Sequence, residues 1–99
     1  MGIRILWAVP ALSDLHELRD YVSNDDPAAA RKLARAIRQR VEGLVQHPAI
    51  GRVVPELPSS GYRELIVPLC RIVYEYAGAE ETVTILRVWH ALRDLSGGW

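Results

Sequence analysis

Arginine recurs inside the apolar runs of the second half of this 99-residue sequence. Arg63, Arg71 and Arg87 each lie within a run rich in Val, Ile, Leu and Tyr, which is the composition of a β-strand. A charge inside a strand costs free energy unless the strand face is solvated or occupied by a partner. We therefore predict a small sheet whose arginine-bearing face is a working surface.

The last of these runs, Thr82–His90, carries the clearest sign of a partner. On a strand with strict alternation, Trp89 shares one face with Val83, whereas Val88 lies on the other. Both faces are thus apolar, although only one can pack against helices, so we expect an uncovered apolar face that takes an apolar partner with acidic residues. The residues that we expect to meet this partner are Arg71, Arg87, Trp89, His90 and Arg93.

The other side chains that commonly take part in catalysis form no recognisable constellation. The sequence contains no glycine-rich phosphate loop, no metal-ligand spacing and no serine–histidine–aspartate arrangement. We interpret His16 and His47 as structural or solvated, and the lone Cys70 as a small buried hydrophobe. His90 differs because it closes the last strand beside Trp89. We expect neither a metal nor another cofactor.

Size and composition predict one domain at residues 1–95, followed by a flexible tail at residues 96–99. With 49% apolar and 24% charged residues, the composition is that of an ordinary globular protein. No run approaches the ~20 apolar residues of a membrane span, and the N-terminus is unlike a signal peptide, so we expect a cytoplasmic protein. The formal charge of zero favours a protein partner over sequence-specific nucleic acid, although a local basic patch can suffice for the latter.

The first elements that we predict are a strand and an amphipathic helix. Residues 3–9 form a short apolar run that ends at Pro10. Apolar residues then recur at three- and four-residue spacing, which predicts a helix with a buried stripe and an acidic outer side. The expected buried residues are Leu12, Leu15, Leu18 and Val22. The expected outer residues are Asp14, Glu17 and Asp20.

A second helix and a sheet complete the predicted fold. Asp26 is a suitable N-cap and Pro27 a suitable first residue for this helix, which ends at His47 and Pro48. Its expected core residues are Ala30, Leu33, Ile37, Val41 and Leu44. Residues 52–61 have loop composition, and strands follow at 62–67, 69–76 and 82–90. The fold class is therefore α+β: an N-terminal strand, a helical hairpin, then a three-stranded antiparallel meander packed on the hairpin.

The two predicted helices carry opposite charges. The first is acidic, whereas the second contains Arg31, Lys32, Arg35, Arg38 and Arg40. One interpretation places opposite charges across the outer seam of the hairpin. The alternative is that Arg31, Arg35 and Arg38 form a binding stripe, since surface ion pairs are worth only ~0–1 kcal/mol each and stability does not require them.

Several short motifs, taken in order, resemble the RelE/ParE superfamily of toxins from bacterial type II toxin–antitoxin modules. They are His-Pro-x-x-Gly at 47–51, Tyr-Arg-Glu-Leu at 62–65, Cys-Arg-Ile-Val-Tyr-Glu-Tyr at 70–76 and Ile-Leu-Arg-Val-Trp-His-Ala-Leu-Arg-Asp at 85–94. The resemblance extends from Ile3 to Leu95 and implies the fold of that superfamily.

Within the superfamily, the sequence is closer to the ParE branch. The RelE branch cuts ribosome-bound messenger RNA by 2′-hydroxyl attack on the phosphate, with basic side chains and a general acid or base. The residues here that resemble that set are Arg63, Arg71 and His90. Leu65, however, replaces a second basic residue, Ala91 falls near a late arginine, and no tyrosine follows Leu95. Each missing donor is worth ~3–4 kcal/mol of transition-state stabilisation, so we favour no residue as catalytic.

The ParE resemblance implies a toxin that inhibits DNA gyrase and is neutralised by a cognate antitoxin. The family places a C-terminal antitoxin segment across the sheet and hairpin, first as a helix and often then as an added strand. We therefore expect acidic antitoxin residues at Arg71 and Arg87. A homodimer is also compatible with the sequence. The alternatives are a RelE-like ribosome-dependent endoribonuclease that uses Arg63, Arg71 and His90, and a non-toxic relic that only binds its antitoxin.

Overall fold

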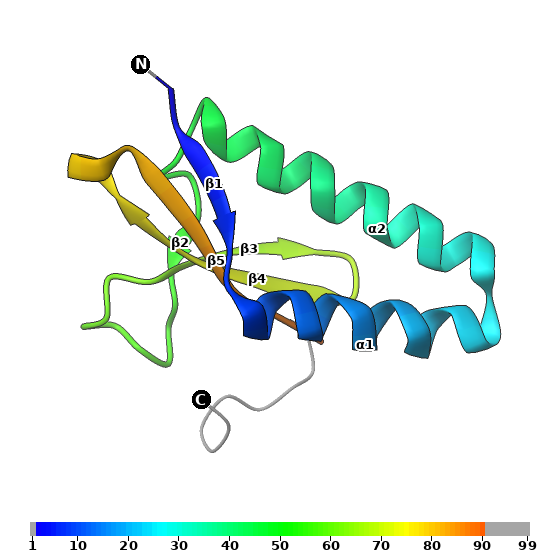
Figure 1. The fold of residues 1–99 in the computed structure, drawn as a ribbon. Coiled ribbons are helices and arrows are strands. Elements are labelled where there is room, and N and C mark those ends of the chain that lie inside the picture. Colours follow the sequence, from blue (N-terminus) through cyan, green and yellow to red (C-terminus); the bar gives the residue numbers. More distant parts are fainter. Residues whose placement is uncertain (1, 91–99) are drawn as a thin grey trace.

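The computed structural model describes residues 2–90 (Figure 1). The strands are β1 (Arg4–Trp7), β2 (Arg52–Val53), β3 (Arg63–Val67), β4 (Cys70–Ala77) and β5 (Thr82–His90). The helices are α1 (Val9–Asp25) and α2 (Pro27–Glu42), with 3₁₀ turns η1 (Gly43–Val45) and η2 (Gly78–Glu80). The end of the predicted domain and its predicted tail lie outside the described residues. Neither α1 nor α2 is long and apolar enough to cross a membrane.

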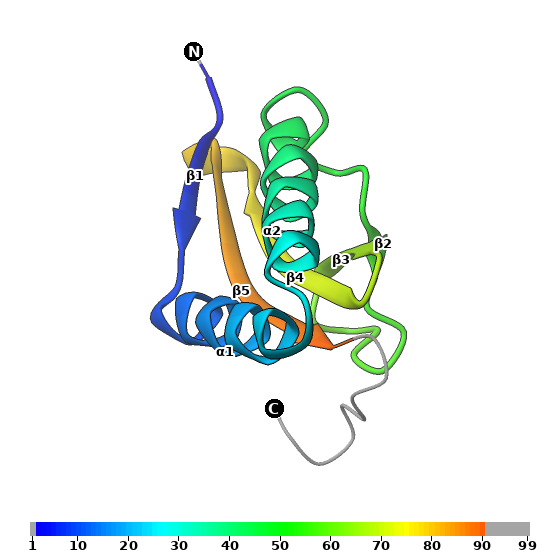
Figure 2. The same ribbon diagram turned by 90° about the vertical axis from the view of Figure 1, so that its right-hand side faces the viewer.

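The strands form one mixed sheet in the order β1-β5-β4-β3-β2. The predicted antiparallel meander β3-β4-β5 is its centre, which confirms the α+β fold class. β1 adds to the meander as a parallel neighbour of β5, and the two-residue β2 adds antiparallel to β3. Figure 2 shows β1 and β2 on opposite sides of the molecule, while Figure 1 shows α1 and α2 joined at one end and diverging toward the sheet.

The first strand is shorter than predicted. β1 ends at Trp7, and Val9 and Pro10 belong to the first turn of α1. Proline fits there because the first amides of a helix need no intrahelical acceptor. The predicted start of the second helix is confirmed, since the Asp26 carboxylate accepts hydrogen bonds from the amides of Ala28 and Ala29.

The main core lies between the helical hairpin and one face of the sheet. The predicted core residues of the second helix are confirmed as buried: Ala30, Leu33, Ile37, Val41 and Leu44. On α1 the prediction was partly wrong, because Leu12 is 42% exposed whereas Asp14 is buried. Ala11, Asp14 and Leu18 follow one another at three- and four-residue spacing, so the carboxylate occupies a position on the buried stripe.

The second sheet face is not the uncovered apolar surface that we predicted. The segment from β2 to β3 folds across it, and Val54 packs with Val73 and Trp89 in a second buried cluster. A β-bulge also interrupts the predicted alternation of β5, because Val73 pairs with Arg87 whereas its neighbour on β4 pairs with Ile85. Val83 and Val88 consequently share the main core, while Trp89 faces the second cluster.

Replacing Ile37 by alanine should lower the free energy of unfolding by roughly 2–5 kcal/mol, because this 2%-exposed side chain fills the space between α2 and the sheet. Urea denaturation followed by circular dichroism measures the change. Gln39→Ala, an exposed position on the same helix, is the matched control and should stay within about 0.5 kcal/mol of the parent. A loss below about 0.5 kcal/mol for Ile37→Ala would contradict this packing.

Candidate functional site

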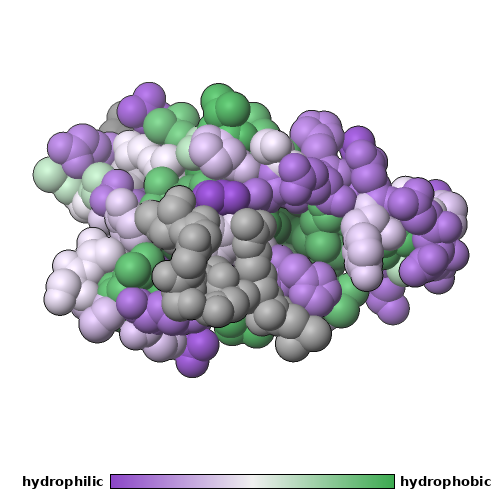
Figure 3. All heavy atoms as spheres, turned by 90° about the horizontal axis from the view of Figure 1, so that it is seen from below, coloured by the Kyte–Doolittle hydropathy of each residue, from purple (hydrophilic) through white to green (hydrophobic). Residues whose placement is uncertain are grey.

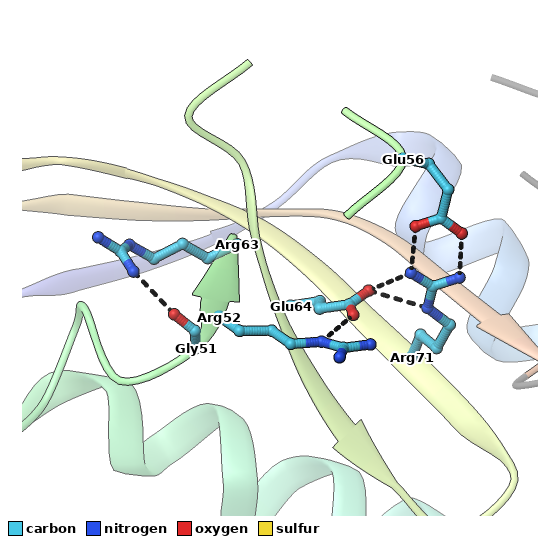
Figure 4. Close-up of polar contacts among 6 residues, drawn as sticks. All are labelled: Gly51, Arg52, Glu56, Arg63, Glu64 and Arg71. Atoms are coloured by element: carbon cyan, nitrogen blue, oxygen red, sulfur yellow. Dashed lines mark hydrogen bonds and ion pairs between the residues drawn. The ribbon is translucent and has the colours of Figure 1, made fainter. Parts of the chain in front are cut away.

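Charged side chains form a network on the sheet face opposite the helices (Figure 4). Glu64 on β3 and Arg71 on β4 share this face with Trp89, since Glu64 pairs in register with Val73 and Arg71 pairs with Trp89. Arg52 on β2 lies opposite Glu64. The fourth member is Glu56, from the segment that covers this face. The meander and the covering segment thus each place one carboxylate beside the guanidinium of Arg71.

The guanidinium of Arg71 is almost fully engaged by these carboxylates. Its Nη1 and Nη2 atoms each donate to one oxygen of Glu56 at 2.8 Å, while Nε donates to Oε1 of Glu64 at 2.8 Å and Nη2 donates to the same oxygen. The hydrogen bonds to Glu56 are the main reason why the pKa of Arg71 is raised. Four of the five N–H groups of a guanidinium are therefore occupied by partners within the chain.

Glu64 is the buried centre of the network. Its side chain has no exposed surface, and its Oε2 atom accepts a 2.6 Å hydrogen bond from Nε of Arg52. A carboxylate without such partners would be expensive to bury. Glu56 is partly exposed, and its hydrogen bonds with Arg71 lower its pKa from 4.5 to about 2. The network therefore ties the covering segment, through Glu56, to the middle of the sheet.

Arg63 points to the other face of the sheet, where it has a structural contact. Its Nη1 atom donates to the carbonyl oxygen of Gly51 at 2.8 Å (Figure 4). The amide of Gly51 donates to the Tyr74 hydroxyl at 2.9 Å. A Cβ atom at Gly51 would lie 2.7 Å from the Tyr74 ring and from the Glu64 carbonyl oxygen. This close approach explains the glycine of the His-Pro-x-x-Gly motif.

Arg87 is held by the buried carboxylate of Asp14, which we had predicted to lie on the outer side of the first helix. Its Nε and Nη2 atoms donate to Asp14 at 2.7 and 2.9 Å, and the amide of Val88 donates to the same carboxylate at 3.0 Å. Arg87 also lies over the Trp89 ring, 4.6 Å from its centroid. Asp14 therefore fastens α1 to the part of β5 that extends beyond β1. The position of Asp14, at three- and four-residue spacing from Ala11 and Leu18, was the feature that could have indicated its burial.

The structure divides the predicted site residues between the two faces. Arg71, Arg87 and Trp89 belong to the covered face, and Trp89 is buried. His90 pairs in register with Cys70, a main-core residue, and lines a groove with Leu18 and Tyr21 on the helix side. Arg63 is also on the helix side, but at the opposite end of the meander. Arg93 lies outside the described residues.

An apolar groove between α2 and the β3–β4 turn was not predicted. Its volume is about 330 Å³. It is lined by Ala29, Lys32, Leu33, Ala36, Pro68 and Leu69. Leu69 is 51% exposed and has φ of 71°, a conformation that favours glycine after the proline of a tight turn. The Pro68–Leu69 sequence was the feature that could have indicated this turn and its exposed leucine.

Comparisons with known proteins agree with this architecture. The family model described as ParE toxin of type II toxin-antitoxin system, parDE, matches residues 5–95. Toxin RelE2 of Caulobacter vibrioides is 33% identical over 90 residues, which cover 91% of this chain and 97% of that protein. The putative toxin Y4kP of Sinorhizobium fredii is 36% identical over 88 residues, covering 89% of this chain and 88% of that protein.

Two solved structures share the fold. The chromosomal ParDE toxin–antitoxin system from P. aeruginosa matches with a TM-score of 0.73 and 25% identity, covering 89% of this chain and 95% of that one. The RelBE2 toxin–antitoxin complex from Mycobacterium tuberculosis matches with a TM-score of 0.60 and 23% identity, covering 91% and 99%, which is a likeness of fold alone. This chain belongs to the ParE toxin family of type II toxin–antitoxin systems, within the RelE/ParE superfamily.

Low pH should reduce the stability of the fold, in part because Glu56 becomes protonated. Because its pKa falls from 4.5 to about 2 on folding, this carboxylate stabilises the fold fully above about pH 5 and loses that contribution as the pH drops toward 2. Glu56→Gln should therefore be less stable than the parent near pH 7, with a difference that narrows by about pH 3. Urea midpoints across this range measure it. Glu42→Gln, which alters an exposed pair with Arg38 at 4.0 Å, should follow the parent; an undiminished difference for Glu56→Gln at low pH would contradict the assignment.

Proposed function

We propose that this chain is a ParE-like toxin that binds and inhibits DNA gyrase and is neutralised by a cognate antitoxin. The gyrase target follows from the resemblance to the ParE branch. The observation that favours inhibition over RNA cleavage is the state of Arg71, the residue that resembles a phosphate-binding arginine of the RelE branch. Its guanidinium already holds Glu56 and Glu64, which leaves one N–H group for any phosphate.

The positions of Arg63 and His90 also argue against RNA cleavage. Cleavage of RNA needs charge-stabilising and proton-transferring groups that converge on one phosphate, each within hydrogen-bond distance of the reacting atoms. Arg71 lies on the covered sheet face, whereas Arg63 and His90 lie on the helix side at opposite ends of the meander. The sheet therefore separates Arg71 from Arg63 and His90. A RelE-like endoribonuclease is the second candidate, because Toxin RelE2 is 33% identical to this chain.

The groove between α2 and the β3–β4 turn supports antitoxin binding. It is mainly apolar, it lies where hairpin and sheet meet, and the solved structures that share the fold are toxin–antitoxin systems. At its rim, Leu69 keeps an unfavourable backbone conformation while half of its side chain faces solvent. The tight turn between β3 and β4 requires this conformation, which holds the half-exposed side chain at the rim of the groove. A segment with aliphatic anchors and an acid near Lys32 fits this groove.

Contacts of the antitoxin with Arg71 and Arg87 stay a prediction. Both guanidinium groups have carboxylate partners inside the chain, so acidic antitoxin residues would have to share or displace Glu56 and Asp14. Arg87→Glu would also break the attachment of α1 to β5. Leu69 therefore gives the cleaner test of antitoxin binding.

Purified protein should inhibit DNA supercoiling by gyrase, or stabilise its cleaved DNA complex, and should leave messenger RNA on ribosomes intact. Both assays use the same preparation, with heat-unfolded protein as control. Codon-dependent RNA cleavage that disappears in Arg71→Ala, in a variant shown to be folded by circular dichroism, would establish the RelE-like alternative. Absence of both activities, with antitoxin binding retained, would establish a non-toxic relic.

Leu69→Asn should weaken antitoxin binding by about 2 kcal/mol, roughly 30-fold in Kd, because it removes an apolar anchor. Asparagine tolerates positive φ, so the variant should keep the stability of the parent. Calorimetric titration with the antitoxin encoded beside this chain measures the affinity. Ile50→Asn, at a 64%-exposed loop position away from the groove, is the matched control. Unchanged affinity for Leu69→Asn would place the antitoxin on another surface.

A further inference from the structure

The solvent-facing side of α2 concentrates positive charge in a chain whose formal charge is zero. The helix contains five basic residues and one acidic residue, which gives it a formal charge of +4. The basic residues are Arg31, Lys32, Arg35, Arg38 and Arg40, and all are exposed. The rest of the chain must therefore carry a formal charge of −4, so the charges are strongly segregated.

The acidic residues of α1 do not neutralise this helix. Within residues 2–90, no ion pair joins α1 to α2, so the interpretation of opposite charges paired across the seam is wrong. Asp20 lies 3.8 Å from Arg19 of its own helix, and Glu42 lies 4.0 Å from Arg38. In this range, no carboxylate is within ion-pair distance of Arg31, Lys32 or Arg35. Figure 3 shows hydrophilic side chains gathered at the end where the helices meet.

Three of the arginines form a straight row, here called the arginine stripe: Arg31, Arg35 and Arg38. They follow one another at four- and three-residue spacing, so they lie on one side of the helix, about 6 Å and about 4.5 Å apart along its axis. The buried residues Leu33, Ile37 and Val41 lie on another side of the helix and pack it against the main core. Lys32 flanks the stripe. The stripe is thus a rigidly supported line of cations that faces solvent.

The surroundings of the stripe restrict its partner. The other exposed residues on that side are small, polar or acidic: Ala28, Ala34, Gln39 and Glu42, the last of which lies 4.0 Å from Arg38. A specific protein interface needs a desolvated apolar or aromatic centre, and single-stranded nucleic acid needs aromatic platforms for its bases. This side of α2 offers neither. The phosphate backbone of duplex DNA, which carries one charge per about 1.7 Å of axis, requires only the positive charges that are present.

We propose that the arginine stripe, with Lys32, binds the phosphate backbone of double-stranded DNA without reading its sequence. One guanidinium group can bind two oxygens of a phosphate at once, whereas a lysine ammonium acts as a point charge. A row of arginines is therefore better suited to phosphates than a row of lysines. The contact neutralises about three phosphates, so the logarithm of the binding constant should fall with the logarithm of salt concentration with a slope of about −2.7. This corresponds to roughly 40-fold weaker binding at 200 mM than at 50 mM salt. The proposal does not depend on gyrase, because bare DNA is the ligand.

Fluorescence anisotropy with a labelled 20-base-pair duplex of arbitrary sequence tests the proposal. The stripe variant combines Arg31→Gln, Arg35→Gln and Arg38→Gln. A matched variant combines Arg4→Gln, Arg40→Gln and Ser59→Asp, at three exposed positions that lie off the stripe. Both variants change the formal charge by −3, so they differ only in where the charge is lost. Circular dichroism and thermal unfolding verify that each is folded.

The unsubstituted protein should bind the duplex at low salt with the slope given above. Each lost phosphate contact lowers the salt slope by about one unit. The stripe variant should therefore lose at least 10-fold in affinity and nearly all of the salt dependence. The affinity of the matched variant should change less than 3-fold. Equal losses in both variants would show an effect of overall charge and overturn the proposal. It would also fail if the protein bound polyglutamate as tightly as DNA, or bound no duplex at about 20 mM salt.

Discussion

The buried carboxylate of Glu64 is the constraint on which the covered side of the sheet depends. Arg71 and Arg52 both donate to it, and Arg71 in turn holds Glu56 of the segment between β2 and β3. Removing one partner of a buried ion pair costs about 3–5 kcal/mol because the other charge is left without compensation. The four side chains therefore act as a unit that attaches the covering segment to the sheet and engages Arg71, the arginine that resembles a phosphate ligand.

Asp14 has a corresponding role on the other side of the molecule. β1 pairs with β5 only as far as Ile85, so the following edge of β5 needs another acceptor for its amides. The Asp14 carboxylate accepts from the Val88 amide and binds Arg87, which joins α1 to the last strand. In both places an arginine inside a strand is balanced by an internal carboxylate. Exposed basic residues are concentrated on α2.

The surface of α2 has two parts of different chemistry, the apolar groove at Leu69 and the arginine stripe. The groove at Leu69 offers apolar area and is suited to a peptide segment of an antitoxin. The arginine stripe offers charge without apolar area and is suited to a polyanion. These surfaces lie on different sides of α2, because Ala29 and Ala36 face the groove whereas Arg31 and Arg35 face solvent. One helix can therefore present both while its third side fills the main core.

The sequence by itself determined the order of the main elements, the core of α2, the Asp26 cap and the family, because periodicity, capping and motif order are local signals. It did not indicate β2, which lies in a segment predicted as a loop. Only the tertiary structure decided what the arginines do. Whether Arg71 faces solvent or Glu56 depends on the path of a loop far from it along the chain, and whether Asp14 is exposed depends on an unpaired amide of β5. The bulge at β5 likewise reversed the faces of Val88 and Trp89. Such pairings arise from long-range geometry, which residue spacing does not encode.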